Sequence, residues 1–133
     1  MTNESIRMRR EHDIIGYRDV PMENLYGIHT LRAFENFNVS GISLSSFSVL
    51  ITSLVIVKLA VAKANAELKL LPTPVSKAIC QACEEIIKGR FHNHFIVDMI
   101  QGGAGTSTNM NINEVIANRA LEINPDSAKA LKS

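Results

Sequence analysis

The sequence predicts a mainly α-helical domain that opens with a short extended or hairpin arm. Three observations carry this prediction: a long apolar run over residues 46–70, an amphipathic stripe over residues 75–87, and a helical period over residues 110–123. Each stretch is longer than a typical strand, and the last two repeat every 3.6 residues rather than every two. Within one domain, 1–133, we expect an arm over 1–40, helices and a glycine loop over 46–123, and a tail over 124–133.

Composition narrows the class of protein. The chain has 133 residues, of which 46% are hydrophobic and 20% charged, which is ordinary for one soluble domain with a core. A net charge of +1 leaves no basic surplus, so nucleic acid is not an expected partner. Two cysteines make no disulfide framework and no leader-like segment opens the sequence, so we expect a cytoplasmic protein.

Turn-forming residues interrupt short apolar pieces throughout the first 37 residues, which favours an extended or hairpin arm. His12 and His29 each lack a second ligand at metal-binding spacing, so we assign them no chemistry. Arg32 is the best functional candidate in the arm because its guanidinium fits a carboxylate, although a structural ion pair is the commoner role for such a residue.

The apolar run from Ser46 to Leu70 carries its first charge only at Lys58, and it predicts a buried helix. A membrane span is the rival interpretation. We do not expect one, because the uncharged window 42–57 is shorter than the roughly 18–20 apolar residues that a span needs, and serines and a threonine dilute it.

A second helix is predicted between Pro72 and Gly89, with Thr73 as its N-cap and Pro74 in the first position. Its apolar stripe comprises Val75, Ala78, Ile79, Ala82, Cys83, Ile86 and Ile87. Cys80 and Cys83 form a CxxC motif, but no second cysteine pair exists and the motif lies mid-helix, so we interpret both as packing residues.

Residues 90–98 are aromatic and apolar and predict a loop or short strand. His92 and His94 would point to one side of an extended chain, where a weak metal site is conceivable. Two ligands do not hold a metal alone, so no metal site is predicted.

The stretch QGGAGTSTNMNINEVIANRA, residues 101–120, combines a glycine-rich loop, three hydroxyl residues and the start of a helix. Glycines allow positive φ and close approach of a ligand, and Thr106, Ser107 and Thr108 offer N-cap oxygens. The helix should reach Ile123, where Asn-Pro-Asp follows, and buried amides that cross-link neighbours would explain its three early asparagines.

A helix start leaves backbone N–H groups unpaired and carries partial positive charge, so this loop is a suitable binding site for a carboxylate or phosphate. The candidate binding residues are Gly105, Thr106 and Ser107. A capped glycine turn without a ligand is the open alternative. A nucleotide P-loop is a weaker alternative, because the lysine that this motif needs before the hydroxyl is missing.

The string GGAGTSTNMNINEVIANRALE resembles the first signature region of the aspartase/fumarase superfamily, and within it the aspartate ammonia-lyases. Fumarases usually have serine where this chain has Ala104 and glutamine where it has Ser107. The strings RREHDIIGYRDVP and YGIHTLRAFENF, from residues 9 and 26, are also similar to the N-termini of aspartases. The second contains H-T-L-R, as aspartases do, where fumarases tend to have Q-T-Q-R.

The resemblance implies the N-terminal helical domain of the L-aspartase-like fold, with the central helix bundle absent from this chain. It implies elimination of ammonia from L-aspartate to give fumarate by a homotetramer without cofactor or metal. Thr106 would contact a substrate carboxylate, beside Ser107 and Gly105. No catalytic residue matches, so we expect the chain to be inactive alone. A fumarate hydratase-like lyase and a non-catalytic module that docks onto intact lyase subunits remain the alternatives.

Overall fold

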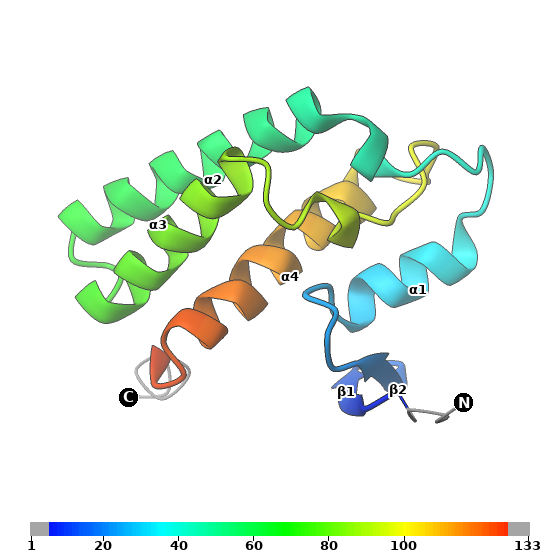
Figure 1. The fold of residues 1–133 in the computed structure, drawn as a ribbon, viewed down its shortest axis with the longest axis horizontal. Coiled ribbons are helices and arrows are strands. Elements are labelled where there is room, and N and C mark those ends of the chain that lie inside the picture. The colour runs from blue at the N-terminus through cyan, green and yellow to red at the C-terminus, as the bar shows by residue number, and fades with distance from the viewer. Residues whose placement is uncertain (1–5, 128–133) are drawn as a thin grey trace, which may run out of the picture.

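The computed structural model describes residues 6–127, which form an N-terminal hairpin followed by helices (Figure 1). The elements in chain order are β1 Met8–Asp13, β2 Gly16–Pro21, α1 Ile28–Asn36, η1 Leu44–Ser46, α2 Ser48–Glu67, α3 Thr73–Ile87, η2 His92–His94 and α4 Thr106–Ile123. The mainly α-helical prediction is therefore confirmed, and α4 ends at the predicted residue.

The helices α2 and α3 lie side by side, α4 packs across them, and α1 contacts α4 (Figure 1). The predicted stripe of α3 faces this core, with Ala82, Cys83 and Ile86 fully buried. Phe95, from the segment before the glycine loop, is the largest fully buried side chain. Burial raises the pKa of the Cys83 thiol to about 12, so this cysteine is a packing residue.

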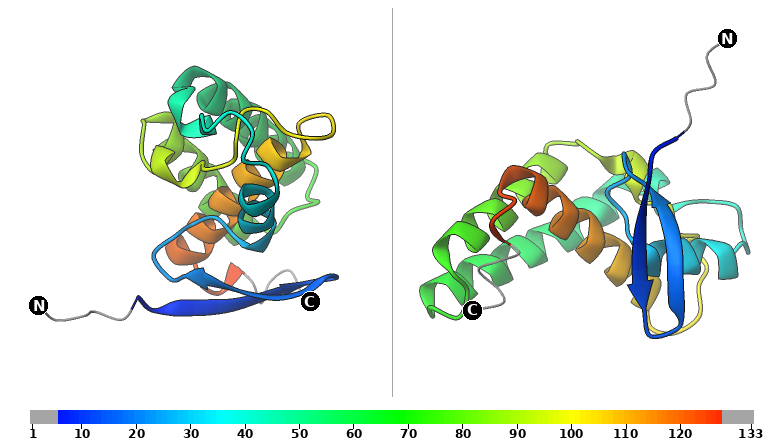
Figure 2. Two further views of the ribbon diagram at one scale, coloured as in Figure 1. Left: turned by 90° about the vertical axis from the view of Figure 1, so that its right-hand side faces the viewer. Right: turned by 90° about the horizontal axis from the view of Figure 1, so that it is seen from below.

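The hairpin lies beside α1 at one end of the helices (Figure 2). Its strands pair antiparallel, with Met8 opposite Pro21. Arg32 of α1 donates from Nε and Nη2 to both carboxylate oxygens of Asp13, at 2.7 and 2.9 Å, and also to the carbonyl of Gly16 at 3.1 Å. Arg32 therefore fixes the hairpin turn to α1, and the structural interpretation of this residue is confirmed.

The prediction of an extended arm over residues 1–40 is wrong for residues 28–36, which form α1. Two carboxylates from other elements receive the N–H groups at its start: Glu11 accepts from Ile28 at 2.7 Å, and Glu114 of α4 accepts from Gly27 and Thr30 at 2.9 and 3.0 Å. A Cβ on Gly27 would come within 3.0 Å of both carboxylates, so a larger residue there would push them away from these N–H groups. The turn-rich sequence gives no sign of these distant caps.

The prediction of a buried helix in the apolar run is also only half right. Ile51 and Val55 of α2 are fully buried, but Val49 is 79% exposed and Val57 is 58% exposed. The helix is long and apolar enough to cross a membrane by length and composition, yet only 17% of its most apolar window is buried in this structure. One side of α2 thus packs into the core, and the other carries apolar side chains into solvent.

Two further boundary predictions need correction. Helix α3 begins at Thr73, with Pro72 as N-cap, so Thr73 caps nothing. Residues His92–His94 form the short 3₁₀-helix η2 rather than an extended chain. His92 pairs with the carbonyl of Ile86 at 3.0 Å, and Nδ1 of His94 accepts from the backbone of Leu25 at 3.2 Å, so both imidazoles serve the fold.

Candidate functional site

The glycine loop reaches α4 through two left-handed residues. Gly103 and Gly105 have φ of 78° and 80°, a region that only glycine occupies without strain. Gly102 lies against the ring of Phe37, where an added Cβ would meet two ring carbons at 3.3 Å. The loop is therefore shaped by its glycines, and residues 102–105 are exposed.

Thr106 is exposed and Ser107 is half-buried at the first two positions of α4, next to Gly105. Within residues 6–127, the backbone N–H groups of Thr106 and Ser107 find no acceptor, and neither hydroxyl is hydrogen-bonded. The predicted residues thus lie together, with two amides and two hydroxyls open to a ligand. The N-terminal end of the helix makes this cluster favourable for negative charge.

The predicted hydroxyl capping of α4 is wrong. The N-cap is Gly105, which has no side chain to offer, and Gln101 supplies the capping oxygen instead. Its Oε1 accepts from the backbone N–H of Thr108 at 2.8 Å, while its Nε2 donates to the Thr108 hydroxyl at 2.8 Å and to the Asp98 carbonyl at 2.9 Å. Gln101 therefore closes the loop and leaves the hydroxyls of the first two helical residues unused.

Asp98 anchors the segment that leads into the loop. Its Oδ2 accepts from the backbone N–H groups of Ser40 and Gly41 at 2.9 and 2.8 Å, and from that of Val39 at 3.2 Å. Its Oδ1 accepts from the Ser40 hydroxyl and the Ile100 N–H, both at 2.7 Å. The Ser40 hydroxyl and these N–H groups lower the pKa of Asp98 to about 2, because they favour the ionised carboxylate.

This arrangement predicts a loss of stability in acid. The folded-state pKa of Asp98 lies below its ordinary value of 3.8, so its contribution is complete above pH 3.8 and disappears as pH falls to about 2. Asp13, held by Arg32, also has a pKa of about 2 and adds to the same window. Urea unfolding across this window should show a weaker pH dependence for Asp98→Asn than for the wild type. Asp19→Asn, at an exposed β2 residue, is the control and should leave the pH dependence unchanged.

Amide side chains near the start of α4 fix the surrounding elements. Asn111 is fully buried, donates to the His94 carbonyl at 3.0 Å and accepts from the Val97 N–H at 3.4 Å. This confirms the predicted cross-linking amide. Asn109 is exposed, and its Oδ1 accepts from Nζ of Lys58 on α2 at 2.6 Å. No signal in the sequence indicated this contact of Lys58, which is the first charge in the long apolar run.

The chemistry of the loop is that of binding. Residues 101–109 contain amides and hydroxyls but no carboxylate, imidazole or thiol. Across the described residues, no group of three or more histidine, cysteine, aspartate or glutamate side chains could hold a metal ion. Such a set of neutral donors can hold and orient an anion, whereas a proton transfer at this position needs a group from elsewhere.

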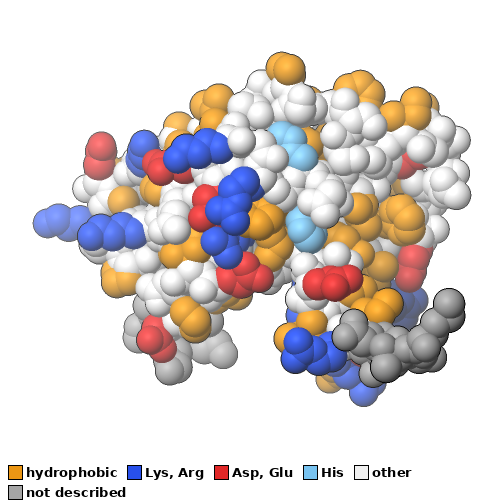
Figure 3. Space-filling model, viewed as in Figure 1, with side chains coloured by type: hydrophobic (Ala, Val, Ile, Leu, Met, Phe, Trp, Pro, Cys, Tyr) orange, Lys and Arg blue, Asp and Glu red, His pale blue; other side chains and the backbone are white. Residues whose placement is uncertain are grey.

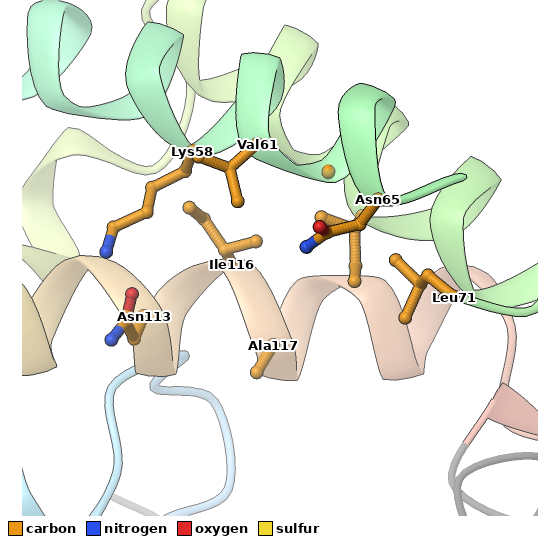
Figure 4. A pocket seen from close by; sticks show the side chains of 9 residues that line it. Lys58, Val61, Asn65, Leu71, Asn113, Ile116 and Ala117 are labelled. Carbon is orange, nitrogen blue, oxygen red and sulfur yellow. The ribbon is translucent and has the colours of Figure 1, made fainter. Parts of the chain in front are cut away.

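A cleft of about 300 Å³ lies further along α4, away from the glycine loop. Figure 4 shows Lys58, Val61 and Asn65 of α2 on one side and Asn113 and Ile116 of α4 on the other. Its walls are mainly apolar, and the lysine stands at the end nearer the start of α4. The cleft thus lies between α2 and α4 and contains none of the predicted site residues.

Comparison with known proteins identifies the family. The sequence profile of the lyase family matches residues 16–131, which is most of the chain. The chain belongs to the lyase family. It is 56% identical over 115 residues to aspartate ammonia-lyase of Helicobacter pylori strain J99, covering 86% of this chain and 25% of that protein. Against aspartate ammonia-lyase of Pseudomonas aeruginosa it is 55% identical over 114 residues, covering 86% and 24%.

Solved structures of lyases share the fold. The fumarate lyase:delta crystallin of Brucella melitensis, in a form bound to cobalt, superposes with a TM-score of 0.87 at 53% identity, covering 88% of this chain and 25% of that one. The class II fumarase of Schistosoma mansoni gives a TM-score of 0.80 at 36% identity, covering 88% and 24%. The helical fold with its N-terminal hairpin is thus that of a lyase N-terminal domain. The chain spans about a quarter of the length of the curated relatives that it matches.

Proposed function

We propose that this lyase chain is the N-terminal part of an aspartate ammonia-lyase, and that its glycine loop binds one carboxylate of L-aspartate or fumarate. The observation that carries the proposal is the open cluster at the start of α4, where the amides and hydroxyls of Thr106 and Ser107 have no partner within residues 6–127. The higher identity to aspartate ammonia-lyases than to the fumarase supports an ammonia-lyase over the fumarate hydratase-like alternative.

In the proposed reaction a base removes a proton from Cβ of aspartate, and ammonia then leaves to give fumarate. The carbanion is stabilised as an aci-carboxylate dianion, which fixed donors at the carboxylate must hold. The Thr106 hydroxyl and the two free N–H groups are suited to bind and orient a substrate carboxylate. Because the loop carries no base, we propose that the 133-residue chain has no turnover alone. We propose in addition that the intact protein is a cytoplasmic homotetramer, as the resemblance to the aspartase/fumarase superfamily implies.

The test of the binding role is Thr106→Val in an intact enzyme. The experiment grafts residues 16–123 of this chain in place of the matching segment of the Helicobacter pylori aspartate ammonia-lyase and follows fumarate by ultraviolet absorbance. Losing a hydrogen bond to a charged group costs about 1.5–3 kcal/mol, so kcat/KM for aspartate should fall roughly 10- to 100-fold. Thr73→Val, at an exposed threonine on α3, is the matched control and should retain full activity.

Two outcomes would contradict the proposal. If Thr106→Val keeps the kcat/KM of the graft, the hydroxyl does not contact the substrate. If the graft hydrates fumarate faster than it releases ammonia from aspartate, the fumarase-like alternative is correct instead. Assay of the unmodified 133-residue chain with aspartate tests the remaining part, because any fumarate above background would contradict inactivity.

A further inference from the structure

The cleft between α2 and α4 has the size and composition of a small-molecule site. Its volume of about 300 Å³ lies at the lower end of the range for ligand sites, which runs from about 300 to 1,000 Å³. Val61 and Ile116 line its middle, Leu71 lines its far end, and Ala117 forms part of the α4 wall (Figure 4). Mostly apolar walls with a few polar groups are typical of such sites.

The polar groups of the cleft are unevenly placed and only partly used. Among the described residues that line it, Lys58 is the only charged one, and it stands at one end. Its ammonium has three N–H groups, and the bond that it donates to Asn109 is its only hydrogen bond within residues 6–127. Figure 4 shows the amide of Asn113 beside Lys58 and that of Asn65 pointing into the cleft, and neither amide has a hydrogen-bond partner within the same residues.

Lys58 also lacks an acidic neighbour. Near the middle of the face shown in Figure 3, basic side chains lie against acidic ones. Arg119, for example, pairs with Glu85 at 2.6 Å and with Glu122 at 2.8 Å. Lys58 is half-buried and forms no ion pair with any residue that the structure describes. The uncompensated positive charge therefore favours an anionic ligand in the cleft.

We propose that this cleft binds a medium-chain carboxylic acid, whose carboxylate accepts from Lys58 and Asn113. The charged end of the cleft takes the head of the ligand, and the apolar middle and far end take its alkyl chain. Residues 58 to 65 of α2 span about 10 Å along the helix axis, which suits an extended chain of about eight carbons. Asn65 is half-buried, so its amide keeps contact with water beside that chain.

Other kinds of ligand fit the cleft less well. An alkylamine would bring its positive charge against the Lys58 ammonium. A dicarboxylate such as aspartate would place its second charge against the apolar end, where nothing compensates it. A helix of another protein is about 10–12 Å across with its side chains, which is too wide for a cleft of this volume. The cleft is therefore a site separate from the glycine loop.

Calorimetric titration of the 133-residue chain with octanoate tests the proposal. We expect a dissociation constant of about 0.1–1 mM, as is usual for so small a ligand. Butanoate should bind at least about tenfold more weakly because its tail does not reach the apolar end, and octyltrimethylammonium should give no measurable binding. Lys58→Gln should weaken octanoate binding roughly 10- to 100-fold, whereas Lys63→Gln, at an exposed lysine of the same helix outside the cleft, should not change it.

Further variants locate the bound acid. Ala117→Leu fills the cleft from the α4 side and should abolish octanoate binding, whereas Ala64→Leu, at an exposed alanine of α2 outside the cleft, should not. Thr106→Val should leave the affinity for octanoate unchanged, which separates this site from the glycine loop. Circular dichroism should show equal helix content in every variant, and Lys58→Met replaces Lys58→Gln if that variant is not folded.

Three results would overturn the proposal. The first is wild-type affinity for octanoate in Lys58→Gln, which would mean that the lysine does not hold the carboxylate. The second is equal binding of octanoate and octyltrimethylammonium, which would show a surface that selects only the apolar chain. The third is a loss of octanoate binding in Thr106→Val as large as that in Lys58→Gln, which would place the acid at the glycine loop.

Discussion

Replacing Glu114 by alanine should lower the free energy of unfolding by about 2–4 kcal/mol, because several donors at the start of α1 lose the only acceptor that they have within residues 6–127. The Glu114 carboxylate accepts from the N–H groups of Gly27, His29 and Thr30 at 2.9, 2.9 and 3.0 Å, and also from the Thr30 hydroxyl. Thr30 is fully buried, so water does not replace the carboxylate there. Urea unfolding measures the loss.

Two variants separate this capping role from the loss of a charge. Glu84→Ala removes an exposed glutamate from α3 and should change stability by less than about 0.5 kcal/mol. Glu114→Gln keeps one acceptor oxygen and should fall between the wild type and the alanine variant. Hydrogen exchange of residues 28–36 should rise most in Glu114→Ala. Wild-type stability in that variant would mean that α1 does not depend on the carboxylate.

Replacing Phe95 by alanine should destabilise the chain by about 3–5 kcal/mol, the usual cost of emptying the site of a buried phenylalanine. Phe95 is fully buried among the side chains of the helical core. Its carbonyl also accepts from the Ser45 N–H at 2.9 Å, which ties η1 to the segment before the glycine loop. The lost side chain would leave a cavity beneath that segment.

The control is Phe34→Ala, at a phenylalanine of α1 that is 52% exposed. It should cost less than about 1 kcal/mol, since much less apolar area leaves water there. The midpoint of urea unfolding should fall for Phe95→Ala without a change in the slope of free energy against urea. Equal midpoints for the two variants would mean that Phe95 does not occupy the core.

The candidate site joins these two structural features. Glu114 lies on α4, the helix whose first residues form the open cluster, and Phe95 lies in the segment that Asn111 of α4 holds in place. The loop itself is exposed, so its geometry depends on Gln101, Asp98 and the buried residues behind it. Binding residues on an exposed loop can in this way be positioned by a rigid helix.

The sequence alone determined the features that depend on local spacing. Apolar positions repeating every 3.6 residues located α3 and α4, and glycines followed by hydroxyls located the cluster of Gly105, Thr106 and Ser107. The amino-acid sequence of that loop also indicated the family. These signals are readable because helical periods and turn residues act over a few positions in the chain.

Only the tertiary structure decided which distant groups complete each local element. Residues 28–36 form a helix because carboxylates from β1 and α4 receive its first N–H groups. Gln101, rather than a hydroxyl, caps α4, and the Asp98 carboxylate accepts hydrogen bonds from the backbone N–H groups of residues 39–41. The sequence of α2 could not reveal which side of the helix is buried, because apolar residues occupy most of its sides. A helix exposes one face only after its neighbours have packed against the other, and that choice is not local.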